Sequence, residues 1–144
     1  MKSIPIRATL FCLGFVMATT ACAEHSFRCN PSRTITRDMT RFFKRELFGQ
    51  GPYAAALRGE WGVAPGDTNA IQVLGDGAEC RRVAKAYARH LREQGRTPLG
   101  DSVTVFHVGR RYYVDPNWAK GEGEPNVMVL DDSLRMIYIV GAAF

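Results

Sequence analysis

Acid–base chemistry in this chain would most naturally fall to a histidine. The chain has three histidines, which are His25, His90 and His107. His107 is the strongest candidate because it alternates with Val103 and Val105 on a run typical of a β-strand, facing either the core or a shallow cleft. Together with an arginine for the phosphate and a carboxylate such as Asp115 or Glu79, His107 could act as a general acid or base on a phosphodiester. The spacing permits such a hydrolase without requiring it.

A second group of polar and aromatic side chains crowds the end of the strand predicted after His107. Tyr112, Asp115 and Trp118 follow one another within seven positions, with Asn117 beside Trp118. Loops held in place by a sheet often form binding pockets, so these residues are candidates for a contact surface. The same residues are also typical of a turn in which Trp118 covers the edge of the core. Both interpretations stay open at the level of sequence.

Arginines recur at every fourth residue along one predicted helix. Arg33, Arg37, Arg41 and Arg45 have this spacing, with Lys44 alongside. On a helix they form one cationic stripe about 18 Å long. Such a stripe is either a solvated helix face or a binding surface for an anionic polymer, with Arg37, Arg41 and Arg45 as its candidate contacts. Aromatic residues do not alternate regularly with these charges, so we do not expect nucleic acid as the partner.

No motif for a metal, a cofactor or a nucleophile is present. The sequence lacks HxH, HExxH and paired CxxC patterns, as well as a phosphate-binding loop and a nucleophile elbow. We therefore expect neither a metal nor a cofactor, and the sequence leans towards binding rather than catalysis.

The cysteines indicate the compartment. The chain has four of them, which are Cys12, Cys22, Cys29 and Cys80. Residues 1–23 read as an export signal, with Lys2 and Arg7 before an apolar run and small residues before a cleavage site after Ala23. Cleavage there would leave residues 24–144 as a single domain and only two thiols, Cys29 and Cys80. In an oxidising compartment these are expected to form one disulfide.

An alternative fate for the leader involves Cys22. The stretch that ends in this cysteine looks like a bacterial lipobox, in which the cysteine would be acylated and become the first residue. Thr19 stands where that pattern prefers leucine. The apolar run is shorter than the roughly 20 residues of a membrane span, so we expect no transmembrane segment in the mature chain.

The charge of the chain is modestly basic. Removal of residues 1–23 takes away Lys2 and Arg7 but no acidic residue, so the net charge falls from +5 to +3. This charge is compatible with an anionic envelope polymer or another envelope protein as the partner, but it does not specify either one.

The elements that must position these residues follow from apolar spacing. One helix is predicted from Asn30-Pro31 to Phe48, a short helical turn over 53–57, and a second helix up to Gly95 that begins with an Asp76–Glu79 capping box. Strands are predicted over 71–74, 102–108, 111–115, 127–130 and 134–140, with a turn at Gly109-Arg110. The last strand is apolar on both faces, which favours a central place in the sheet.

The predicted fold class is α+β. We expect two amphipathic helices, plus the short helical turn, packed on one face of a mainly antiparallel sheet of four to five strands. The expected function is that of an exported bacterial domain, periplasmic or secreted, which binds a partner as a non-enzymatic accessory protein of the cell envelope. The alternatives are a small secreted basic hydrolase resembling a ribonuclease, and an accessory lipoprotein anchored through Cys22.

Overall fold

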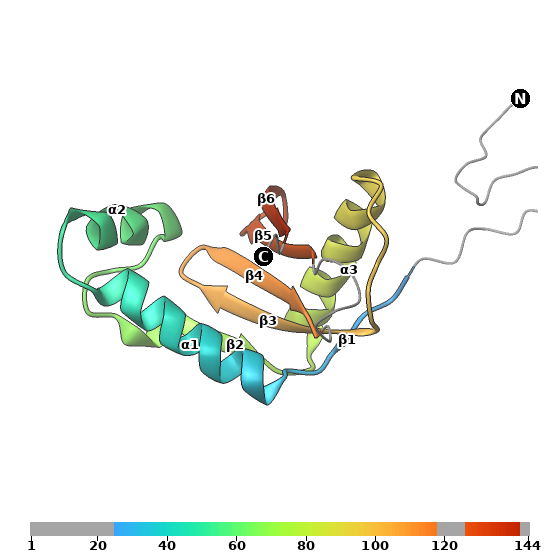
Figure 1. Cartoon of the computed structure of the whole chain (residues 1–144), viewed down its shortest axis with the longest axis horizontal. Helices are drawn as coiled ribbons and strands as arrows, with labels where there is room; N and C mark the ends of the chain where they lie inside the picture. The colour runs from blue at the N-terminus through green and yellow to red at the C-terminus, as the bar shows by residue number, and fades with distance from the viewer. Residues whose placement is uncertain (1–24, 118–125, 142–144) are drawn as a thin grey trace, which may run out of the picture.

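A computed structural model of the chain describes residues 25–117 and 126–141 (Figure 1). The predicted leader over 1–23, Cys22 and Trp118 lie outside the described residues. In chain order the elements are β1 (Arg28–Cys29), α1 (Arg33–Phe48), α2 (Pro52–Trp61), a 3-10 turn (Thr68–Ala70), β2 (Ile71–Leu74), α3 (Ala78–Glu93), β3 (Ser102–Val108), β4 (Arg111–Pro116), β5 (Asn126–Asp131) and β6 (Met136–Gly141).

The α+β class is confirmed, and the sheet is larger and more mixed than expected. It has six strands in the order β1-β3-β4-β5-β6, and β2 also pairs with β3. The short strand β1 pairs parallel with the start of β3, whereas β2 pairs antiparallel with the remainder of β3. The other pairings are antiparallel. Because β1 has only two residues, hydrophobic periodicity could not identify it.

Helices cover both faces of the sheet, and the expectation of a single covered face is wrong. Val103 and Val105 of β3 share a core with α3, whereas Phe106 and Val108 share a second core with α1 and α2. Successive side chains of a strand point to opposite faces, so these two cores lie on opposite sides of β3. A strand that is apolar on both faces requires cover on both.

Helix α1 begins two positions later than the sequence suggests. Its N-cap is Ser32 rather than Asn30, and the Ser32 side chain accepts a hydrogen bond from the Ile35 N–H at 3.2 Å. The buried side of the helix carries Phe43 and Leu47. The predicted helical turn that follows is a full helix, α2, which starts with Pro52 in its first turn.

Helix α3 lacks the predicted capping box. Its N-cap is Gly77, which has no side chain to cap the helix, and Asp76 pairs with Arg81 at 3.0 Å. Glu79 instead bonds to Tyr112 on β4. The tertiary contact replaces the local one and leaves this carboxylate available to the sheet.

Strand β6 lies at the edge of the sheet, which contradicts its expected central place. Within the described part of the chain it pairs only with β5. Ile137 and Tyr138 keep 38% and 41% of their surface exposed, as an edge position allows. A continuous apolar run indicates two apolar faces, but it carries no information about the number of neighbouring strands.

The predicted disulfide is confirmed. Cys29 of β1 is bonded to Cys80 in the first turn of α3, with their Cα atoms 6.2 Å apart and both side chains buried. The bond lies in the core shared by α3 and the sheet. It therefore fixes the start of the domain to the helix that carries Glu79.

None of the helices in the described residues is long and apolar enough to cross a membrane.

Candidate functional site

His107, Glu79 and Tyr112 form one cluster on the α3 side of the sheet. The His107 Nδ1 atom lies 3.1 Å from Glu79 Oε2, and the Tyr112 hydroxyl donates to the same oxygen at 2.7 Å. The imidazole stacks on the Tyr112 ring, with the ring centroids 4.3 Å apart and the planes inclined by 19°. Two contacts thus hold the imidazole, one at its edge and one at its face.

Three elements bring this cluster together. His107 and Tyr112 are direct partners across the β3–β4 ladder, so their side chains project from the same face of the sheet. Glu79 comes from the first turn of α3, which packs over that face. The side chain of His107 is 28% exposed and that of Glu79 is 41% exposed. The cluster is therefore open to solvent on one side.

The electrostatics of the cluster centre on Tyr112. Burial and the hydrogen bond to Glu79 raise the pKa of Tyr112, while a hydrogen bond from Arg82 opposes them. Arg82, one turn after Glu79, therefore faces the same tyrosine. When the His107 proton is on Nδ1 and donated to Glu79, the Nε2 atom keeps a free lone pair that can accept a proton.

Asp115 does not belong to this cluster. It pairs with Thr104 across the ladder, on the face opposite to that of His107, and its Oδ2 atom accepts from the Tyr113 hydroxyl at 3.4 Å. Burial raises the pKa of Asp115 to about 6, against a smaller lowering by the hydrogen bond from Tyr113. Of the two carboxylates considered for His107, the structure places only Glu79 beside it.

Asn117, beside the predicted pocket residue Trp118, has a structural role. Its side-chain amide donates to the Asn30 carbonyl at 2.6 Å and to the Ser102 hydroxyl at 2.9 Å, and its oxygen accepts from Thr104 at 2.6 Å. Thr104 in turn accepts from the Ser32 N–H at the start of α1. This network joins the end of β4 to the segment before α1. Asp115 and Pro116 belong to β4 itself and not to a turn, so that part of the turn interpretation is wrong.

The predicted arginine stripe lies on the exposed side of α1. Two of its members pair with neighbours along the helix: Arg37 with Asp38 at 2.9 Å, and Arg45 with Glu46 at 3.2 Å. Helix α1 belongs to the core opposite to that of α3. The stripe and the His107 cluster are thus separate surfaces, and Tyr112, Asp115 and the arginines do not form one site.

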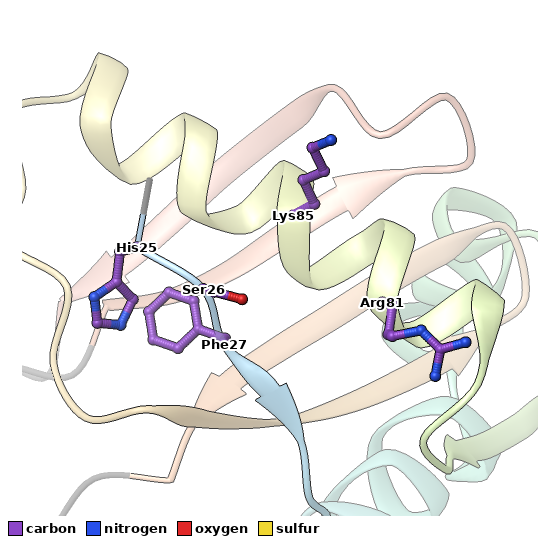
Figure 2. Close-up of a pocket in the computed structure, with 5 residues that line it drawn as sticks. All are labelled: His25, Ser26, Phe27, Arg81 and Lys85. Carbon is purple, nitrogen blue, oxygen red and sulfur yellow. The ribbon is translucent and has the colours of Figure 1, made fainter. Parts of the chain in front are cut away.

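The structure also has a surface cavity that sequence reasoning missed. Its lining residues are His25, Ser26, Phe27, Arg81 and Lys85, from the segment before β1 and from successive turns of α3 (Figure 2). The i,i+4 spacing of Arg81 and Lys85 on the second predicted helix is visible in the sequence. Their juxtaposition with residues 25–27 depends on the parallel pairing of β1, which the sequence did not reveal.

The described residues hold no group of three or more histidine, cysteine or acidic side chains that could bind a metal ion. Comparisons with protein-family models, curated proteins and solved structures give no match. The chemistry of these surfaces is therefore the basis for a functional proposal.

Proposed function

We propose that this protein is an exported, disulfide-linked binding domain of the bacterial cell envelope and that it contacts an anionic partner through the arginine stripe. The stripe comprises Arg33, Arg37, Arg41 and Arg45 with the adjacent Lys44. The observation that carries the proposal is the unbalanced charge of this surface. Within the described part of the chain, Arg33, Arg41 and Lys44 have no ion pair, and all five cations are exposed.

The stripe is electrostatically unfavourable for the isolated domain. Like charges spaced four residues apart on a helix repel by roughly 0.2–0.5 kcal/mol per pair. The apolar side of α1 already supplies its packing through Phe43 and Leu47, so the stripe is not needed to hold the helix in place. An anionic polymer along the helix would remove the repulsion and release bound counterions.

The disulfide supports the export part of the proposal. Buried disulfides form and persist in oxidising compartments and are rare in the bacterial cytosol. Cys29 and Cys80 are the two cysteines that remain after removal of the predicted leader, and they are bonded to each other. A lipid-anchored form that is acylated at Cys22 would contain the same domain, because β1 begins after Cys22, at Arg28.

Charge reversal on the stripe tests the binding proposal. We expect the triple variant Arg33→Glu, Arg41→Glu and Lys44→Glu to lose at least about tenfold in affinity for peptidoglycan sacculi or an immobilised sulfated polysaccharide. The control reverses three cations on other elements, Arg28, Arg89 and Arg135, and so changes the net charge equally. Because these three are ion-paired with Asp101, Glu93 and Asp131, melting curves must first show that both variants are folded. Equal losses in both variants, or no binding by the unaltered domain, would refute a role for the stripe.

A second candidate function, phosphodiester hydrolysis, is favoured by one specific observation. His107, a carboxylate and an arginine converge on one surface, through Glu79 and through the contact between Arg82 and Tyr112. In this reaction Glu79 would orient the imidazole, and His107 Nε2 would remove a proton from the attacking hydroxyl. The new P–O bond would form as the bond to the leaving oxygen breaks, that oxygen would take a proton from water, and Arg82 would neutralise the phosphate.

A single assay separates the two functions. If the domain is a ribonuclease-like hydrolase, His107→Ala should lower the rate of RNA cleavage by about 10²-fold or more, and Glu79→Gln should lower it and shift its pH profile. Asp115→Asn is the matched control, because Asp115 lies on the other face of the sheet. If purified unaltered protein cleaves no RNA, the hydrolase is excluded and the binding function stands alone.

A further inference from the structure

The cavity between the segment before β1 and helix α3 has the composition of a ligand site. It has a volume of about 230 Å³ and is lined by two cations, one imidazole, one hydroxyl and one phenyl ring. Figure 2 shows His25, Ser26 and Phe27 in one short segment of chain and Arg81 and Lys85 on successive turns of α3. No carboxylate is among the lining residues, so the charge of the cavity is positive.

The two cations have donor capacity to spare. Arg81 uses one nitrogen to pair with Asp76 at 3.0 Å, and a guanidinium carries five N–H donors. Lys85 is exposed and makes no ion pair or hydrogen bond to any residue in 25–117 or 126–141. Asp76 already balances part of the Arg81 charge, so an anionic ligand would meet the spare N–H donors of Arg81 and the ammonium of Lys85.

The apolar wall of the cavity is held rigidly. Phe27 is only 6% exposed, and its ring packs against His25 and Tyr87, with ring centroids 4.4 Å and 5.1 Å away. His25 Nε2 bonds to the Gly100 carbonyl at 3.0 Å, which fixes the imidazole. Cys29, two residues after Phe27, is tied by the disulfide to α3, so both walls of the cavity are fastened to each other.

We propose that this cavity binds the phosphate monoester of a single sugar ring. Its volume is below the range of roughly 300–1,000 Å³ that holds drug-sized ligands, so it suits a small molecule. A phosphate monoester carries close to two negative charges at neutral pH, which matches Arg81 and Lys85 better than a single carboxylate does. The apolar face of a sugar ring would pack on the wall formed by Phe27 and His25, and the Ser26 hydroxyl would bond to a ring hydroxyl.

This site is independent of the arginine stripe. Arg81 and Lys85 lie on α3, whereas the stripe lies on α1, and these helices belong to different cores on opposite faces of the sheet. Substitutions at one surface therefore leave the other intact.

The test is titration of the full mature domain with glucose 6-phosphate, followed by calorimetry and by amide shifts in NMR spectra. We expect binding of glucose 6-phosphate to be tighter than that of inorganic phosphate or glucose. Arg81→Gln and Lys85→Gln should each weaken it about tenfold, and Lys85→Arg should restore part of the loss. The matched control Arg33→Gln with Lys44→Gln removes two charges from α1 and should change affinity by about twofold at most.

Three results would overturn the proposal. The first is no binding of glucose 6-phosphate at millimolar concentration. The second is equal affinity for inorganic phosphate, which would leave the aromatic wall without a role. The third is an equal loss in the α1 control, which would indicate attraction to the overall charge. Gln is a good helix former, so both α3 variants should fold, and their thermal melting curves verify this.

Discussion

Asp115 and Tyr112 are three residues apart in the sequence, yet they have different environments. Tyr112 faces α3 and joins His107 and Glu79, whereas Asp115 faces the other side of β4 and bonds to Tyr113. An odd spacing on a strand reverses the face, so two side chains that appear clustered in the sequence are separated by the sheet. A buried carboxyl without a cationic partner among the described residues is costly when charged.

This cost makes the contribution of Asp115 to stability dependent on pH. Its pKa is about 6 in the folded chain, above its ordinary value of 3.8, so the folded state holds the proton more tightly than the unfolded state. The contribution of Asp115 to the free energy of unfolding is therefore fully present below pH ~4. It falls by roughly 2–3 kcal/mol as the pH rises through ~6. Asp115→Asn keeps an acceptor for Tyr113 and should stabilise the domain at pH 8 but not at pH 4.

Urea denaturation from pH 4 to pH 8 measures this effect. Asp131→Asn is an informative control because hydrogen bonds from the Arg135 and Ser133 N–H groups lower the pKa of Asp131. Its contribution is present at neutral pH and is lost as the pH falls, so the two substitutions should differ in sign at pH 8. If Asp115→Asn destabilises the domain equally at all pH values, Asp115 is ionised and partnered in the native state.

At the scale of elements, the β3–β4 hairpin aligns the candidate cluster. Gly109 has φ +60°, and an added Cβ would meet the Trp61 carbonyl at the end of α2. Arg110 donates its N–H to the same carbonyl at 2.7 Å. The turn is thus held against α2, and it sets the register that places His107 opposite Tyr112.

Substitution of this glycine should weaken the hairpin. We expect Gly109→Ala to lower the free energy of unfolding by about 2–4 kcal/mol, because a positive φ and a steric clash with backbone act together. Gly95→Ala is the matched control: it has φ +67° but no atom within 4 Å of the added Cβ, so only about 1 kcal/mol should be lost. Equal losses at the two glycines would show that contact with α2 is unimportant.

Much of the element order could be predicted from sequence, and the failures have a common cause. Periodicity located α1, α3 and the four long strands, because each has an apolar face several residues long. It missed β1, the edge position of β6 and the second covered face, because these depend on which strands pair. Likewise the sequence pattern predicts a local capping box for Glu79, whereas its partners come from β3 and β4.

The same limit applies to the candidate site. His107 and Tyr112 could be selected by residue type, and their direct pairing follows once the Gly109 turn is fixed. The cavity beside β1 could not be predicted, because residues 25–27 reach α3 through a two-residue strand and a disulfide. Such contacts are set by tertiary packing and leave no periodic signal in the chain.

At the scale of the whole molecule, the disulfide should contribute much of the stability. Cys29 and Cys80 are separated by 51 residues, and closing such a loop restricts the unfolded chain by about 4 kcal/mol. Reduction, or replacement of both cysteines by serine, should therefore lower the melting temperature by about 10–15 °C. Calorimetry with and without reductant measures the difference, and coincident melting curves would show that the bond adds no stability.

The central claim is that the protein works outside the cytoplasm as an oxidised domain. Intact-mass analysis of the protein isolated from the envelope of its native cells tests this claim most directly. The account predicts a chain that begins at Glu24, or at an acylated Cys22, with Cys29 and Cys80 joined. A native protein that retains Met1 and carries free thiols at both positions would contradict it.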